Sequence, residues 1–107
     1  MQFMSFLQNG TLTVALVGEI DHHCAKNYMI SISAKIEAYT PRECILDFQD
    51  VTFMDSSGIA VVINALRNMN KLGGKLMVTG LAEQPMKVFC ASGVDKLIEI
   101  KEVTHEI

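Results

Sequence analysis

Apolar and polar residues alternate near the start of the chain, and further along the apolar residues recur at helical spacing. Residues 3–7 and 12–17 have the two-residue period of strands. Asn9-Gly10 lies between them and is the strongest two-residue signal for a hairpin. A helix follows, in which we expect Asp21 to be the N-cap and Pro41 to end the helical pattern. Its predicted inward residues are Ala25, Tyr28, Met29, Ile32, Ile36 and Tyr39.

The second half of the chain alternates short apolar runs with two further helical patterns. Residues 44–48 predict a buried strand, and residues 57–71 predict a helix that ends at Gly73-Gly74. Residues 75–79 predict the next strand, and a third helix with Pro85 in its first turn ends at Gly93. Residues 96–100 predict a final strand. The inward residues are expected to be Ile59, Val62, Ile63, Leu66 and Met69 in the second helix, and Met86, Phe89 and Cys90 in the third.

The predicted order β-β-α-β-α-β-α-β indicates an α/β fold. Alternating strands and helices give parallel strands with right-handed crossovers, and the opening hairpin adds an antiparallel edge. We therefore predict a single domain over residues 1–107, with a mixed, mostly parallel sheet, an N-terminal hairpin and packed helices. Residues 101–107 have no clear pattern and could form a frayed helical turn.

Composition and charge indicate which kinds of partner and which cellular compartment to expect. Half of the 107 residues are apolar, a fifth are charged and the net charge is -3, which is typical of a globular domain. No basic run occurs, so we expect no nucleic acid partner. The longest apolar run, residues 59–63, is too short to cross a bilayer, and no signal peptide is recognisable. Cys24, Cys44 and Cys90 are odd in number and widely spaced, which predicts a reducing cytoplasm, with Cys44 and Cys90 in the core.

The chemistry is concentrated in Phe53-Met54-Asp55-Ser56-Ser57-Gly58, where a helix is predicted to begin. Residues 18–21 and 49–57 follow the carboxyl ends of two predicted parallel strands, so we expect Asp21, Asp55 and Ser57 to converge. The start of a helix favours negative charge, which makes Ser57 a candidate phosphorylation switch. Gly58 would let another protein approach closely. The alternative is that these residues only cap the helix.

A phosphate on Ser57 would act through its charge of roughly -1.5 to -2. Repulsion between two unit charges at about 4 Å is worth about 4 kcal/mol at an effective dielectric constant of about 20. A hundredfold loss of affinity needs only about 2.7 kcal/mol, so one phosphate can end binding while the fold persists. The second helix also carries an uncharged outer strip, which we expect to dock a partner unless it is merely an exposed face. Its residues are Val61, Asn64, Ala65, Asn68 and Lys71.

Catalytic and cofactor sites are less well supported. A nucleophilic Ser57 would need a base such as His22 or His23, but G-x-S-x-G is absent because Asp55 stands in place of the first glycine. Adjacent histidines on a helix point about a hundred degrees apart, which disfavours a metal site. They could instead tune partner affinity with pH. No nucleotide-binding glycine loop is present, so we expect neither a cofactor nor an enzyme.

These motifs resemble the STAS family, the sulfate-transporter and anti-sigma-factor-antagonist domain, over essentially the whole chain. The resemblance is carried by Gly18-Glu19-Ile20-Asp21, by Phe53-Met54-Asp55-Ser56-Ser57-Gly58-Ile59, and by Gly73-Gly74 before a strand. Asp21-His22-His23 resembles the sporulation branch of the family, the anti-sigma F factor antagonists. Members of the family commonly carry a further C-terminal helix, whereas this chain ends soon after its last predicted strand.

The resemblance implies a mechanism. An unphosphorylated antagonist binds an anti-sigma factor that is also a serine kinase, and a sigma factor is released. The kinase then phosphorylates the residue matching Ser57, binding ends, and a metal-dependent serine phosphatase reverses the step. Asp21 and Asp55 match the family's acidic residues beside that serine. The alternative is a STAS-like domain that binds a nucleotide or small anion on the same edge. The residues expected to contact the partner are Asp21, His22, Asp55, Ser56, Gly58, Val61 and Asn64.

Overall fold

The order of strands and helices in the computed structural model is the predicted one. The structure describes residues 3–101. Residue 101 lies in the last strand, so the rest of the ambiguous segment 101–107 falls outside the described residues. The elements are β1 (Phe3–Gln8), β2 (Thr11–Ile20), α1 (Ala25–Tyr39), β3 (Glu43–Met54), α2 (Ser56–Lys71), β4 (Lys75–Thr79), α3 (Glu83–Ser92), the short 3₁₀ helix η1 (Val94–Lys96) and β5 (Glu99–Lys101).

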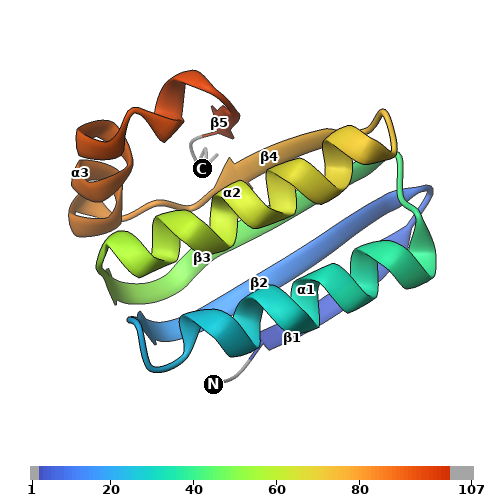
Figure 1. Ribbon diagram of the computed structural model, residues 1–107. Helices are drawn as coiled ribbons and strands as arrows, with labels where there is room; N and C mark the ends of the chain where they lie inside the picture. Colours follow the sequence, from blue (N-terminus) through green and yellow to red (C-terminus); the bar gives the residue numbers. More distant parts are fainter. Residues whose placement is uncertain (1–2, 102–107) are drawn as a thin grey trace, which may run out of the picture.

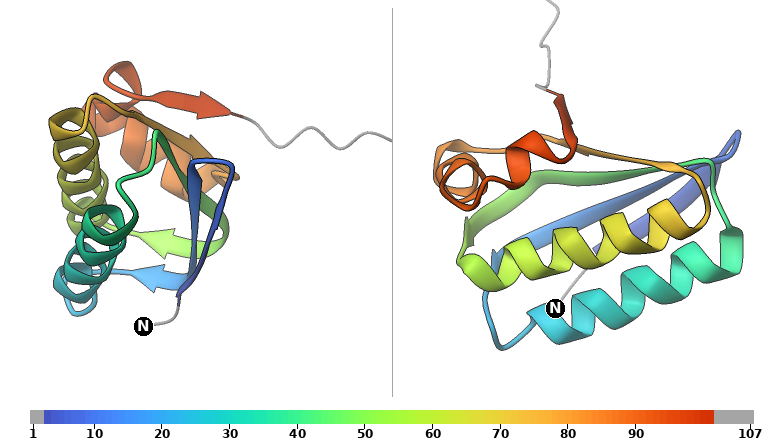
Figure 2. Two further views of the ribbon diagram at one scale, coloured as in Figure 1. Left: turned by 90° about the vertical axis from the view of Figure 1, so that its right-hand side faces the viewer. Right: turned by 45° about the horizontal axis from the view of Figure 1, so that its top comes forward.

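The sheet has the strand order β1-β2-β3-β4-β5, in which β1 and β2 are antiparallel and the other neighbours are parallel. The hairpin turn is formed by Asn9 and Gly10, whose φ angles of 53° and 82° are both positive, as this two-residue turn requires. α1 and α2 lie side by side along one face of the sheet (Figures 1 and 2). This confirms the predicted fold class.

The core lies between the sheet and the helices. Leu12, Val14 and Leu16 of β2 alternate toward the helices and are fully buried. Cys44, which was predicted to be buried, pairs with Leu12 in the register of β2 and β3. α3 closes the far end of the core, where Phe89 meets the edge of Phe48 with 5.6 Å between ring centroids.

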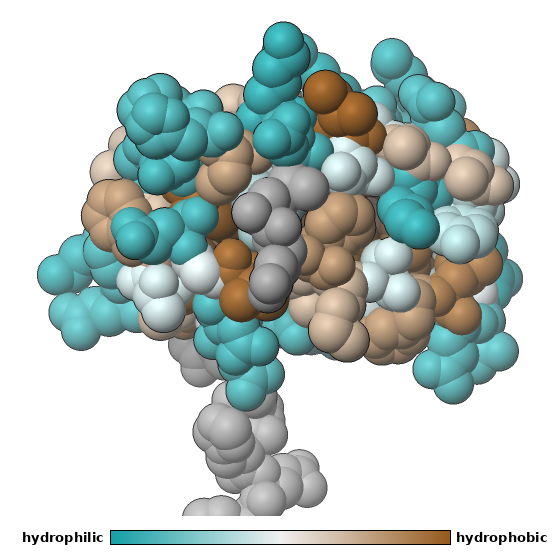
Figure 3. Space-filling view, turned by 90° about the horizontal axis from the view of Figure 1, so that it is seen from below, coloured by the Kyte–Doolittle hydropathy of each residue, from teal (hydrophilic) through white to brown (hydrophobic). Residues whose placement is uncertain are grey.

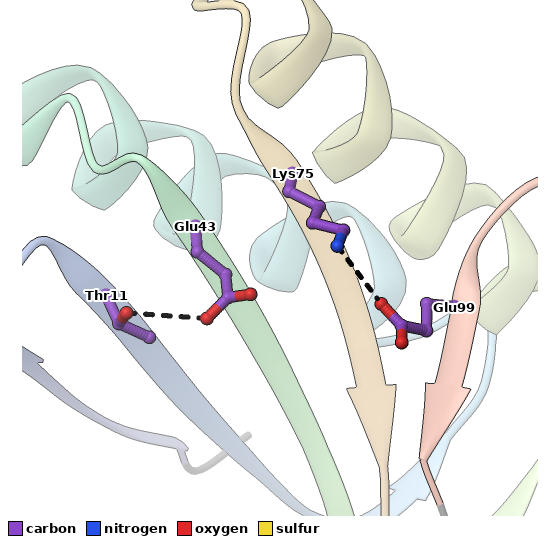
Figure 4. A network of polar contacts seen from close by, with 4 residues as sticks. All are labelled: Thr11, Glu43, Lys75 and Glu99. Atoms are coloured by element: carbon purple, nitrogen blue, oxygen red, sulfur yellow. Dashed lines mark hydrogen bonds and ion pairs between the residues drawn. The ribbon is translucent and has the colours of Figure 1, made fainter.

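Polar pairs lie across neighbouring strands at the surface of the sheet (Figure 4). Thr11 donates to Glu43 at 3.4 Å, and Lys75 forms an ion pair with Glu99 at 3.5 Å. Both members of the ion pair are exposed, so it contributes little to stability. The edge strand β1 carries exposed apolar side chains, and apolar and polar residues are mixed over the side of the molecule seen in Figure 3.

Three predicted details are wrong at the ends of elements. α1 begins at Ala25 with Cys24 as the N-cap, because Asp21 belongs to a separate turn that precedes the helix. The last strand is shorter and later than predicted, since residues 94–96 form η1. Tyr39 and Cys90 were predicted to face inward but are exposed, because the helical stripe drifts off the core near the end of each helix.

The predicted outer strip of α2 is also wrong. Val61 and Ala65 are buried, with exposures of 1% and 0%. Asn64 and Asn68 donate to the hydroxyl of Ser33 on α1. The physical reason is that α1 covers the flank of α2, so α2 buries one side against the sheet and another against its neighbour. The part of the strip from Val61 to Asn68 belongs to the contact between the two helices rather than to a docking surface, and only Lys71 is exposed.

Candidate functional site

Two register shifts in the pairing of β2 with β3 determine which residues lie opposite each other where the two strands end. Ala15 pairs with Asp47, an offset of 32, whereas Ile20 pairs with Met54, an offset of 34. β3 therefore contains two extra residues, and the second register shift lies beside Gly18, whose φ of 84° suits glycine. Without these two residues Asp21 would lie level with Phe53 instead of Asp55.

The two predicted loops do meet at the carboxyl edge of the sheet. The backbone N–H of Asp55 donates to the carbonyl of Ile20 at 3.2 Å, which places Asp55 beside the Ile20–Asp21 peptide. The strands run further than predicted, to Ile20 and Met54, so the edge consists mainly of strand ends rather than loops.

Asp55 performs the capping of α2. Its Oδ1 accepts from the backbone N–H of Ser57 at 2.8 Å, and its carbonyl accepts from Gly58 N–H at 3.0 Å. The carboxylate and the main-chain carbonyl of this N-cap residue thus each satisfy one donor at the start of the helix. We call residues 54–58 the Ser57 turn.

Neither serine hydroxyl of the Ser57 turn has a hydrogen-bond partner within residues 3–101. Ser56 is exposed and Ser57 is half-buried. The hydroxyl of Ser57 is thus not needed as the helix cap, and it is not sealed in the interior. This arrangement leaves the hydroxyl available for a reaction with an outside group.

The turn that contains Asp21 faces the Ser57 turn from the end of β2. Asp21 Oδ1 accepts from His23 N–H at 3.0 Å. Desolvation alone would raise the pKa of Asp21, but the hydrogen bonds from His23 and Cys24, together with the electrostatic effect of the nearby His23 side chain, lower the pKa below its ordinary value. Asp21 is therefore ionised at neutral pH. The rings of His22 and His23 are exposed and lie 4.0 Å apart between centroids.

Gly58 is buried beneath Met54. A Cβ added to Gly58 would lie 2.7 Å from Met54 Cε and 3.2 Å from Met54 Cβ. The missing side chain therefore lets α2 approach the end of β3. The predicted partner contacts at Gly58 and Val61 do not fit their burial, whereas Asp21, His22, Asp55 and Ser56 lie at or near the surface.

Two residues at this edge were missed from the sequence. Phe53 precedes the Ser57 turn and is 41% exposed, although it was not among the residues expected to contact a partner. Gln84 of α3 accepts from Met54 N–H and donates to Met54 C=O, both at 2.9 Å. A polar residue next to Pro85 gives no sequence signal of a contact thirty residues away.

The part of the chain that the structure describes holds neither a candidate metal site nor a helix suited to span a membrane. Across residues 3–101, no three His, Cys, Asp or Glu side chains are grouped so that they could hold a metal ion. None of the helices in this part of the chain combines the length and the apolar character needed to cross a bilayer.

The described residues form a mixed sheet with a hydroxyl-bearing turn at its carboxyl edge. Residues 6–107 match the sequence model of the STAS domain family, and the chain belongs to this family. The family expectation from the motifs is therefore confirmed.

Several relatives carry regulatory names. The chain is 32% identical over 84 residues to the anti-sigma F factor antagonist of Lysinibacillus sphaericus, covering 78% of this chain and 72% of that protein. It is 28% identical to the anti-sigma-B factor antagonist of Listeria monocytogenes, with 90% and 83% covered. The structure of the Bacillus cell fate determinant SpoIIAA in its phosphorylated form superposes with a TM-score of 0.75 and 27% identity over 97% of this chain and 93% of that one.

Proposed function

We propose that this protein is an anti-sigma factor antagonist whose binding is ended by phosphorylation of Ser57. Its unphosphorylated form binds an anti-sigma factor that is also a serine kinase, and a sigma factor is released. The kinase transfers the γ-phosphoryl group of ATP to Ser57 Oγ, which loses its proton, and ADP leaves. A metal-dependent serine phosphatase hydrolyses the phosphate with water. The domain is the substrate and the binding partner, not the catalyst.

The observation that carries the proposal is that the side chain of Asp55, and not that of Ser57, caps α2. Asp55 caps α2 with its carboxylate, so the fold does not need the hydroxyl of Ser57. A hydroxyl that makes no hydrogen bond within the described part of the fold and lies at the partly exposed start of a helix can be phosphorylated without unfolding the domain. The names of the related antagonists support the same class of function.

A phosphate on Ser57 would add enough negative charge to repel a partner that binds the unphosphorylated surface. The cap carboxylate of Asp55 and the ionised Asp21 already make this edge negative. A phosphate adds roughly -1.5 to -2 to the same place. A partner surface that matches two carboxylates and a neutral hydroxyl then faces excess negative charge, and about 2.7 kcal/mol of repulsion lowers affinity a hundredfold.

The contact surface combines charge with one aromatic side chain. Asp21, His22 and Ser56 are at or near the surface around the Ser57 turn, and Phe53 adds apolar area beside them. Aromatic side chains in the middle of an interface commonly supply most of the binding energy. We therefore assign Phe53 as the apolar anchor and the carboxylates as the part of the surface that senses phosphate.

The test uses the cognate anti-sigma serine kinase, ATP and the intact protein. The mass should rise by one phosphate group, Ser57→Ala should prevent the rise, and Ser56→Ala is the matched control that should retain it. Ser57→Asp should bind the kinase at least about tenfold more weakly while unfolding at the same temperature as the parent protein. A phosphate found on Ser56, or unchanged binding by Ser57→Asp, would contradict the proposal.

A further inference from the structure

One edge of β3 lacks a neighbouring strand where it approaches the Ser57 turn. The ladder between β3 and β4 runs from Glu43 to Asp47, after which β4 ends and β3 continues to Met54. The other edge of β3 remains paired with β2 as far as Ile20. The backbone groups of Met54 that face away from β2 therefore need partners from elsewhere.

The side-chain amide of Gln84 supplies both partners. Its Oε1 accepts from Met54 N–H and its Nε2 donates to Met54 C=O, each at 2.9 Å. One amide thus takes the place of the missing strand. Met54 is fully buried, so water would not readily replace these bonds. A side-chain amide offers an acceptor and a donor on neighbouring atoms, so it can bind both backbone groups of one residue.

This contact holds the start of the Ser57 turn from a second side. The neighbouring N–H of Asp55 is bound to Ile20 of β2, and Asp55 in turn binds Ser57 N–H. We infer that Gln84 is a positioning residue that fixes the backbone from which the Ser57 hydroxyl projects for phosphoryl transfer, an inference that rests on the proposed function. α3 thereby takes part in the switch although none of its residues needs to contact the kinase.

The effect should appear in the rate of phosphorylation. Phosphoryl transfer depends on holding the attacking oxygen in line with the phosphorus atom, and a displacement of about 1 Å can cost a hundredfold in rate. Gln84→Met keeps the approximate length of the side chain but removes the amide. We expect about a tenfold fall in kcat/KM for phosphorylation of Ser57, carried mainly by kcat.

The first measurement needs no partner. Amide hydrogen exchange of Gln84→Met should be faster than in the parent protein at Met54, Ser57 and Gly58, and unchanged at Val14 in the core. Gln8→Met, the same change on the exposed edge strand β1, is the matched control. Unchanged exchange at Met54 in Gln84→Met would overturn the inference, because the contact would then not hold the turn.

The second measurement compares phosphorylation rates by the anti-sigma kinase. Ser33→Ala removes contacts between α1 and α2 and controls for a general loss of stability. The inference requires that Gln84→Met slow phosphorylation while Ser33→Ala and Gln8→Met do not. Equal rates for Gln84→Met and the parent would overturn it. If the parent itself gained no phosphate, the proposed function and the positioning role would both fall, whereas hydrogen exchange would still show whether Gln84 holds the turn.

Discussion

The side-chain amide of Asn64 lies 2.9 Å from the hydroxyl oxygen of Ser33, and the amide of Asn68 donates to the same oxygen at 2.7 Å. One serine of α1 thus satisfies two amides of α2. This polar contact joins the two helices along the flank that α2 turns away from the sheet. It explains why asparagines rather than charged residues occupy that flank.

Ser33→Ala should therefore weaken the fold rather than partner binding. Two half-buried amides lose their acceptor, which predicts a fall of about 1–2 kcal/mol in the free energy of unfolding. Urea denaturation of the two proteins measures the difference. Ser31→Ala, on the same helix but outside this contact, should unfold nearly as the parent does. A loss of affinity for the anti-sigma partner with no loss of stability would restore the strip as a docking surface.

Phe53→Ala should weaken binding to the anti-sigma partner by more than its loss of folding stability accounts for. The residue is 41% exposed, so the folded monomer loses only part of a fully buried side chain, about 1–2 kcal/mol in the free energy of unfolding. Loss of an aromatic anchor typically costs about 2 kcal/mol or more, which is roughly thirtyfold in the dissociation constant. Titration calorimetry would give both constants. Phe6→Ala on the edge strand β1 removes an exposed ring far along the chain from the site, and an equal effect there would show that Phe53 is no special anchor.

Gly58→Ala should destabilise the protein because its Cβ would meet Met54. Overpacking costs about 1–3 kcal/mol, partly offset by the gain of up to about 1 kcal/mol for alanine over glycine in a helix. We expect a net loss of about 1 kcal/mol in the free energy of unfolding. The same substitution made in Met54→Ala should cost less, since the 2.7 Å contact with Cε is removed and only the 3.2 Å contact with Cβ remains. If both backgrounds respond alike, Met54 is not the cause.

The regular parts of the fold could be predicted from the sequence because local patterns encode them. The Asn9-Gly10 turn, the alternation of Leu12, Val14 and Leu16, and the glycine at 73 that ends α2 each depend on near neighbours in the chain. The meeting of Asp21 and Asp55 followed from topology, since parallel strands end at a common edge.

The rest depended on contacts between distant segments. The extra residues of β3 break its alternation after Phe48, so the strand seemed to end there. Val61 and Ala65 looked like an outer face because one helix alone does not reveal that a neighbour lies beside it. The bonds between Gln84 and Met54 join α3 to the end of β3, and no periodicity marks them.

Cys44 should make the fold less stable in alkaline solution. Burial, with a smaller effect from the charge of Glu43, raises the pKa of the Cys44 thiol from 9.0 to about 12. Between these values the unfolded chain has lost the thiol proton and the folded one has kept it. The free energy of unfolding therefore falls as pH rises above about 9, by at most about 1.4 kcal/mol per pH unit from this group.

Urea denaturation at several pH values between 8 and 11 measures this slope. Lysine and tyrosine residues also titrate in this range, so the informative quantity is the difference between variants. Cys44→Ala should have a shallower slope than the parent, and Cys90→Ala, which removes a thiol from an exposed site, is the matched control. Parallel slopes for the parent and Cys44→Ala would mean that the folded protein releases the thiol proton as readily as the unfolded chain, and Cys44 would then not lie in the dry core between β2 and the helices.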